Sequence, residues 1–404
     1  MEQLLYFGTS WANNHEKIYL LGDAVLFLLF LIAVLYLFIF ALFSLKKRKD
    51  QYPTAKKKYK FAVLFPAYKE DTVILESVHS FFKQDYPKEQ YDLIVISDQM
   101  SDTTNQKLQD LSAIVLEIKD PQSTKTNALQ LVTKHIDNNN LSYDIIVIMD
   151  ADNLVDYDFL NKINDAFYSG CSAVQTHRVA KNRDTNTAVL DAVSEEINNS
   201  IFRKGHTQLG FSSALIGSGM AFEYELFRDN IMKAGHIGVD KQLERSLLIQ
   251  NIYIEYLEDV YTYDEKIKES TGFYNQRRRW LSNQFTNLFC GISELPLALL
   301  KGNWDYCDKL FQWMMPPRVI LFGFIFLFAC FFTWFNWAMA IKWWGLLLLL
   351  CITFSMAVPD YLVDNKFKKA IRNLPILFLL MFFNFFRLKG ANKEFIHTEH
   401  GSTN

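Results

Sequence analysis

The chain has 404 residues, of which 50% are hydrophobic, and a formal net charge of −2. This charge argues against a nucleic-acid-binding protein, because such binding depends on basic surfaces that contact phosphates. The length allows two or three domains. Its five cysteines form no CxxC pair, so neither a disulfide framework nor a zinc site is predicted.

The first long apolar segment, Asp23–Leu45, is long enough to cross a membrane as a helix. It exceeds the apolar part of a signal peptide, and no cleavage site follows it. Basic residues between Lys46 and Lys60 mark the cytoplasmic side of the membrane. We therefore predict an integral inner or plasma membrane protein with an extracytoplasmic segment over 1–22, a transmembrane helix over 23–45 and a cytoplasmic domain over 46–280.

Residues from about Tyr59 to Glu265 have the pattern of a soluble α/β domain. Strands that alternate with helices predict a mainly parallel, Rossmann-like sheet that is covered on both faces. The four predicted strands are Phe61–Ala67, Asp92–Asp98, Ala113–Ile118 and Asp144–Asp150. Neither a GxGxxG motif nor a P-loop motif is present, which argues against a dinucleotide-binding fold and against a P-loop nucleotide-binding protein. Ligands of such sheets bind beyond the carboxyl ends of the strands.

Aspartates stand at two of these strand ends. Asp150 and Asp152 form the stretch "DAD" after the fourth strand. Two aspartates at this spacing can share one Mg²⁺ or Mn²⁺, whose remaining positions commonly hold substrate phosphates. The same pattern also occurs by chance in acidic loops and helix caps, but its place after a buried strand favours a metal site. Asp98 is either a turn residue or a group that recognises a base or ribose.

Three further features have both a structural and a functional interpretation. Lys125 is a solvated helix lysine or a phosphate contact. Gly217, Ser218 and Gly219 form a turn or a floor for a bound sugar. Asp240 and Glu244 lie one helical turn apart, and either is a candidate general base. The alternative is that Asp240 caps a helix and Glu244 is an ordinary exposed residue.

The stretch "QRRRW" ends the predicted cytoplasmic domain. Its arginines are either a basic band at a membrane surface or ligands of a charged substrate. Residues 281–317 mix apolar and aromatic residues with few charges and predict interfacial amphipathic helices. Two to three transmembrane helices are predicted over 318–388, because Val319–Ala340 and Trp343–Val363 can span a membrane. Leu374–Phe386 is short for a span, so the side on which the tail over 389–404 lies stays open.

Together these motifs resemble those of membrane-embedded family 2 glycosyltransferases of the GT-A fold. This group contains the synthases of cellulose, chitin, hyaluronan and poly-N-acetylglucosamine. The resemblance covers about residues 60–285 and the membrane arrangement. It rests on the order of "FPAYKED", "QDYP", "VISDQMSD", "KTNAL", "MDADN", "AVQ", "GSG", "VDKQLE" and "QRRRW".

The resemblance implies an inverting, processive transferase that extends and exports a β-linked polysaccharide from a UDP-sugar. It assigns donor binding to Asp98 and Lys125, with Asp150 and Asp152 as ligands of Mg²⁺ or Mn²⁺. Asp240 would be the base. Gln276, Arg279 and Trp280 match the family's Q-x-x-R-W motif, which assigns Gln276 and Arg279 to donor binding, with Arg278 as a second candidate for the donor's charge. The acceptor would lie against Gly217, Ser218, Gly219 and Trp280.

The chain departs from the family pattern at Val239, where relatives carry a second carboxylate beside the base, and at Lys69, where many have asparagine. A non-processive enzyme that adds one sugar to a membrane lipid is the first alternative, and an inactive membrane scaffold is the second. The sugar, the linkage, homo-oligomer formation and export partners are left open. The expected partners are a UDP-sugar, a polysaccharide acceptor and the lipid bilayer, without nucleic acid.

Overall fold

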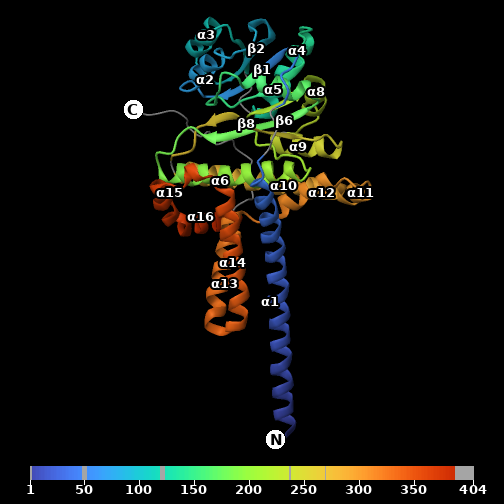
Figure 1. Ribbon diagram of the computed structural model, residues 1–404, viewed down its shortest axis with the longest axis vertical. Coiled ribbons are helices and arrows are strands. Elements are labelled where there is room, and N and C mark those ends of the chain that lie inside the picture. Colours follow the sequence, from blue (N-terminus) through green and yellow to red (C-terminus); the bar gives the residue numbers. More distant parts are fainter. Residues whose placement is uncertain (1, 48–51, 119–122, 236–237, 269, 387–404) are drawn as a thin grey trace.

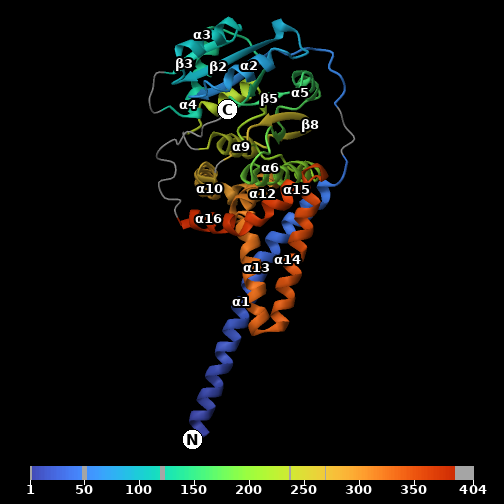
Figure 2. The ribbon, with the colours of Figure 1, turned by 90° about the vertical axis from the view of Figure 1, so that its left-hand side faces the viewer.

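The computed structural model describes residues 2–47, 52–118, 123–235, 238–268 and 270–386. The predicted tail over 389–404 lies outside them. An α/β domain forms one end of the molecule, and the helices α1, α13 and α14 extend away from it (Figure 1). Helices α6, α10, α12, α15 and α16 form a layer between the sheet and the three extending helices (Figure 2).

The α/β domain is built on one mixed sheet in the order β3-β2-β1-β4-β7-β6-β8-β5. Strands β1 to β4 pair in parallel, β6 and β8 are parallel to each other, and β7 and β5 run antiparallel to their neighbours. The strands are β1 Phe61–Tyr68, β2 Tyr91–Asp98, β3 Ile114–Ile118, β4 Ile145–Ile148, β5 Leu154–Val155, β6 Ala173–Ala180, β7 Met220–Glu223 and β8 Glu255–Asp264. The four strands predicted from the sequence are therefore confirmed, and they are the parallel part of the sheet.

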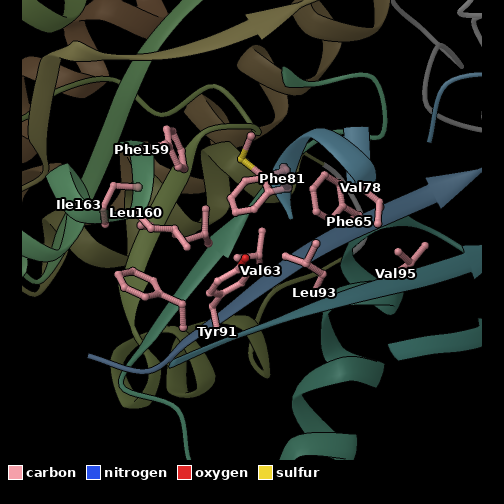
Figure 3. Packing of buried hydrophobic residues seen from close by; sticks show 14 of the residues in the cluster. Val63, Phe65, Val78, Phe81, Tyr91, Leu93, Val95, Phe159, Leu160 and Ile163 are labelled. Atoms are coloured by element: carbon pink, nitrogen blue, oxygen red, sulfur yellow. The ribbon is translucent and has the colours of Figure 1, made fainter. Parts of the chain in front are cut away.

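Both faces of this parallel part are buried, which explains its nearly continuous apolar sequence. Along β1, Phe61, Val63 and Phe65 point to one face, and Ala62 and Leu64 point to the other. Figure 3 shows the first face, where Val63 and Phe65 pack with apolar residues of helices α2 and α5. Helices α4, α8 and α9 cover the second face.

Helices precede, connect and follow the strands. In chain order they are α1 Glu2–Ser44, α2 Ile74–Phe81, η1 Lys88–Gln90, α3 Asp102–Asp110, α4 Lys125–Asn138, α5 Phe159–Tyr168, α6 Asn186–Asn198, the π-helix η2 Asn199–Gly205, α7 His206–Gln208, α8 Tyr224–Ile231, α9 Val239–Ile249, α10 Ser270–Gly291, η3 Ile292–Glu294, α11 Leu295–Leu300, α12 Trp304–Met314, α13 Arg318–Phe335, α14 Trp337–Ala357, η4 Asp360–Leu362, α15 Asn365–Ala370, η5 Ile371–Asn373 and α16 Leu374–Phe386.

Within the described residues, three helical segments are long and apolar enough to cross a membrane: Tyr19–Ser44 of α1, and the whole of α13 and α14. Helix α16 has only 13 residues and lies across the ends of α13 and α14 rather than alongside them (Figures 1 and 2). Two of the predicted domain boundaries fall inside helices, and the division into domains stays a prediction. Helix α1 runs from Glu2 through residue 22 without a break, and α10 runs through residue 280.

Helix α1 is attached to the α/β domain through closely packed side chains. The ring of Phe40 stacks on His206 with 3.6 Å between ring centroids. The hydroxyl of Tyr36 lies 2.8 Å from His206 Nε2 and donates to Asp308 Oδ1 of α12 at 2.6 Å. Gly205 lies directly against the backbone of Phe40, and a Cβ atom there would collide with the Phe40 carbonyl oxygen.

We expect the substitution Gly205→Ala to destabilise the protein, because α1 and η2 would have to separate to accommodate one methyl group. Such overpacking costs roughly 1–3 kcal/mol. Thermal unfolding of the purified full chain in detergent would show this as a lower melting temperature. Gly345→Ala in α14 is the matched control, because a Cβ atom at Gly345 meets no atom within 4 Å. Equal melting temperatures for the two variants would contradict the expected tight contact.

Candidate active site

The carboxyl ends of neighbouring parallel strands bring the predicted aspartates to one edge of the sheet. Asp98 is the last residue of β2, and Asp150 follows β4 after one intervening residue. Both line a cavity of about 2110 Å³, together with Asp152, Lys125 and Asp240. Residues that are 142 positions apart in the chain, from Asp98 to Asp240, therefore share one cavity.

Lys125 is the first residue of helix α4, whose N-terminus faces the aspartates. Its Nζ donates to Asp150 Oδ1 at 2.5 Å and to the carbonyl oxygen of Gly217 at 2.8 Å. Its place is fixed by Thr124, whose hydroxyl caps α4 by accepting a hydrogen bond from the backbone N–H of Asn127 at 3.2 Å. Lys125 is thus an ion-pair partner within the site and not a solvated helix lysine.

Asp152 is held rigidly by the turn that follows β4. Its side chain is buried, and its two oxygens accept hydrogen bonds from the backbone N–H of Glu265 at 2.7 Å and from Asn153 Nδ2 at 3.2 Å. Asn153 in turn accepts from the backbone N–H of Asp150 at 2.9 Å. Asn153, which the sequence did not single out, therefore orients both aspartates.

The donor set at this turn fits a divalent cation that shares its coordination with a ligand. Asp150 and Asp152 line the cavity, and carboxylate oxygens are ligands that suit Mg²⁺ or Mn²⁺. Among the residues that the structure describes, no group of three or more histidine, cysteine or acidic residues lies together as a complete metal site. Two protein carboxylates would leave the remaining coordination positions to phosphate oxygens and water.

A network of buried charges lies next to the turn that carries Asp150 and Asp152. Arg178 of β6 pairs with Asp264 at the end of β8 at 2.6 Å, and Lys266 pairs with the same carboxylate at 2.9 Å. Burial alone would raise the pKa of Asp264, but Arg178 and Lys266 hold it far below its usual value. Asn153 Nδ2 lies 3.4 Å from Asp264 Oδ1, which connects the network to the aspartate turn.

Glu195 of α6 belongs to the same network and makes the fold sensitive to acid. Its carboxylate pairs with Arg203 at 2.9 Å, and Lys266 lies 3.8 Å away. Burial opposes ionisation, yet Arg203, Lys266 and Arg178 lower the pKa of Glu195 from 4.5 to about 2. Because the folded state binds this proton less readily than the unfolded chain, the contribution of Glu195 to stability is complete above about pH 5 and is lost as the pH falls toward 2.

We therefore expect the melting temperature of the wild type to fall more steeply between pH 5 and pH 3 than that of the Glu195→Gln variant. The full shift corresponds to a contribution on the order of 3 kcal/mol. Glu225→Gln is the control, because the Glu225 side chain is 69% exposed. A Glu195→Gln variant with the same pH slope as the wild type would show that this carboxylate does not titrate in the unfolding transition.

The three residues of the predicted acceptor floor have different environments. Gly217 lines the cavity with a positive φ of 89°. Ser218 is fully buried and its hydroxyl donates to Asn153 Oδ1, away from the cavity. Gly219 packs against Thr176 and Thr262, whose hydroxyls a Cβ atom would meet. Only Gly217 is therefore placed to contact a ligand, whereas Ser218 and Gly219 support the aspartate turn.

Helix α9 separates the two candidate bases. Asp240 lies in its first turn and lines the cavity. Glu244 has no exposed surface, and its carboxylate lies 3.0 Å from Lys241 Nζ and 3.0 Å from Lys309 Nζ. Burial would raise the pKa of Glu244, but these two ammonium groups lower it. Glu244 is thus neither a base open to a substrate nor the exposed residue of the alternative interpretation.

Helix α10 brings part of the "QRRRW" stretch to the cavity. Gln276, Arg277, Arg279 and Trp280 line it, whereas Arg278 does not. Burial lowers the pKa of Arg279, and the negative charges of Asp150 and Asp240 partly offset this effect, so its guanidinium lies within electrostatic range of both carboxylates. Arg277 forms an ion pair with Asp191 and places its guanidinium 4.7 Å from the centre of the Trp280 ring. One face of Trp280 is therefore covered by a cation.

The strand order and the aspartate turn define a GT-A-like glycosyltransferase domain. The model of the glycosyltransferase-like family 2 matches residues 59–283, which is more than half of the chain. The chain therefore belongs to family 2 of the glycosyltransferases and is an enzyme of that family. The processive subtype that the sequence motifs suggested is not distinguished by this match.

One solved structure supports the fold, and a second shows a weaker similarity. A mannosyltransferase from Pyrobaculum calidifontis, in complex with GDP-Man and Mn²⁺, matches 83% of this chain and 98% of its own at 17% identity, with a TM-score of 0.51. TarS residues 1–349 from S. aureus match 83% of this chain and 91% of their own at 15% identity, with a TM-score of 0.40. Among curated protein sequences, none is significantly similar to this chain.

Proposed function

We propose that this family 2 glycosyltransferase transfers a sugar from a UDP-sugar to an acceptor hydroxyl with inversion of the anomeric configuration. The observation that supports the proposal is the meeting of Asp98, the Asp150–Asp152 turn, Asp240 and Arg279 around one cavity. These groups come from four different elements and supply the charges that such a transfer needs.

In this proposal each side chain has a separate task. Asp98 recognises the uridine, and Lys125 and Arg279 hold the diphosphate. Asp150 and Asp152 would hold Mg²⁺ or Mn²⁺, whose charge would offset that of the departing UDP. Asp240 accepts the proton of the acceptor hydroxyl, whose oxygen attacks the anomeric carbon as the bond to UDP breaks. Gln276 lies at the cavity with a buried Oε1 atom that has no hydrogen-bond partner among the described residues, so it is suited to a sugar hydroxyl.

The acceptor would arrive from the membrane side of the cavity. The same cavity is lined by residues of α13, α14 and α16, two of which are candidate spans. Extension and export of a β-linked polysaccharide, as the motifs suggest, is the first form of the proposal. Transfer of one sugar to a membrane lipid is the second, and the apolar character of this part of the lining favours it. In both forms the protein is a multi-pass membrane protein with its catalytic domain in the cytoplasm.

The test uses the purified full chain in detergent with Mn²⁺ and a panel of UDP-sugars, with GDP-mannose included. Release of UDP from at least one UDP-sugar is expected, and the product then distinguishes the two forms: a ladder of polymer lengths or one sugar on an extractable lipid. Release of GDP alone would replace the donor assignment. If no nucleotide is released from any donor, the chain is an inactive scaffold and the proposal fails.

A further inference from the structure

The cavity changes character where it leaves the α/β domain. Beyond Arg318 in the chain, the lining residues come from the region of α13 to α16, and all except Ser355 have apolar side chains or none. Phe322, Phe326, Leu327, Phe354, Phe378 and Met381 belong to this apolar wall. Gly323 permits the wall to form, because a Cβ atom there would collide with the ring of Phe378 in α16. Such a wall suits a hydrocarbon chain better than a hydrated polymer.

Two arginines stand where the apolar wall meets the catalytic half of the cavity. Arg318 Nη2 donates to the carbonyl oxygen of Ser194 at 3.0 Å and to its hydroxyl at 3.1 Å. Arg277 Nη2 lies 3.5 Å from the same hydroxyl, so the two guanidinium groups are neighbours. Both line the cavity.

Arg318 has no counter-ion within the described part of the chain. It forms no ion pair, and its Nη1 atom is buried without a hydrogen-bond partner among the described residues. Its remaining contact is with Phe202, whose ring centre lies 5.8 Å from the guanidinium carbon. Burying an unpaired charge costs several kcal/mol, as a rough guide. An anion bound at Arg318 would offset this cost.

The surrounding charges do not supply one. Arg318 and Arg277 share contacts to Ser194, whose chain neighbour Glu195 belongs to the buried network, so these charges form one neighbouring cationic cluster. Its cations are Arg178, Arg203, Lys266, Arg277 and Arg318, and its carboxylates are Asp191, Glu195 and Asp264. Five cations against three carboxylates leave an excess of two positive charges, and Asp150, which lines the same cavity, is paired with Lys125.

We propose that this end of the cavity binds a membrane lipid that carries a phosphate group, with the phosphate at Arg277 and Arg318 and the hydrocarbon chain along the apolar wall. A free phosphate would use the arginines but leave the wall without a ligand, and a neutral lipid would leave Arg318 without an anion. The inference rests on the proposed function and specifies its acceptor class, because the lipid's headgroup would lie in the same cavity as Asp240.

The test measures lipid binding separately from catalysis. Native mass spectrometry of the full chain in detergent would compare a polyprenyl phosphate, the corresponding polyprenol and inorganic phosphate. We expect the polyprenyl phosphate to bind, with at least roughly tenfold weaker binding of the alcohol, as loss of a charged hydrogen bond implies. Arg318→Gln should weaken binding of the phosphate lipid to a similar extent, and Arg318→Lys should retain most of it.

Arg372→Gln is the matched control, since Arg372 is an exposed cation next to α16 that does not line the cavity. Equal binding of lipid phosphate and alcohol to the wild type would overturn the inference even if Arg318→Gln does not fold. So would equal effects of Arg318→Gln and Arg372→Gln, or equal binding of inorganic phosphate and the phosphate lipid. UDP release without selective lipid binding would refute only this inference, whereas no release with any donor would refute the proposed function.

Discussion

Replacing Asp240 by asparagine should reduce sugar transfer at least about 100-fold, because a general base commonly contributes 10²- to 10⁴-fold to a rate. UDP binding should change little, since asparagine retains the shape of the side chain and since Asp98, Lys125 and Arg279 are untouched. Initial rates with the best donor from the screen and titration with UDP would measure the two quantities separately.

Asp229→Asn is a suitable control for this prediction. Asp229 lies in the neighbouring helix α8 with 62% of its side chain exposed, and it pairs only with Arg228 in the described structure. Normal transfer by Asp240→Asn would remove the base from the proposal. Equal losses of transfer and of UDP binding would instead indicate that Asp240 contributes to donor binding.

The substitution Arg279→Lys should lower kcat/KM by roughly 10- to 100-fold, because lysine keeps the charge but cannot offer a forked pair of donors to the diphosphate. That range corresponds to the loss of one hydrogen bond to a charged group. Steady-state kinetics over a series of donor concentrations would show whether the loss appears in KM or in kcat.

The adjacent Arg278→Lys provides a close control, because Arg278 lies on the same helix but does not line the cavity. The pair of variants resolves the two interpretations of "QRRRW". If Arg279 holds the diphosphate, only Arg279→Lys is impaired. If the arginines form a basic band at the membrane surface, both variants retain normal activity because both retain the positive charge.

The parallel half of the sheet could be predicted because its strands are short apolar runs that are buried on both faces. The other half, in which parallel and antiparallel pairs are mixed, could not be predicted, and the parallel pair β6 and β8 shows why. Buried polar residues such as Thr176 and Arg178 of β6 interrupt the apolar pattern, and they are compensated by Thr262 and Asp264 of β8. These partners are 86 residues apart, so no local feature of the sequence indicates that they meet.

In the candidate site, too, some residues could be placed from the sequence and others could not. The strand-end rule placed Asp98, Asp150 and Asp152 at one cavity, and the "QRRRW" stretch does reach it. The order of residues along α10, however, could not tell that Arg277 faces the cavity and Arg278 does not. Nor could it tell that Glu244 is enclosed by two lysines, because Lys309 comes from α12, 65 residues further along the chain. Asn153 was adjacent to the motif and is the one missed residue that a local search could have found.

Helix α1 also fixes the position of the catalytic domain along the helix axis, and its rotation around that axis, relative to the candidate spans. At the middle of the helix Asp23 contacts Lys342 and accepts from Trp343 Nε1 of α14 at 3.0 Å, and nearer its C-terminus Tyr36 contacts His206 and Asp308. Tyr36 lies thirteen positions after Asp23, and at about 100° per residue this places the two side chains roughly 140° apart around the helix axis. Inserting one residue between Asp23 and Tyr36 would therefore rotate one side chain by about 100° around the helix axis relative to the other and break one of the two contacts. An insertion of about seven residues, close to two full turns, would restore their relative orientation and only lengthen the helix.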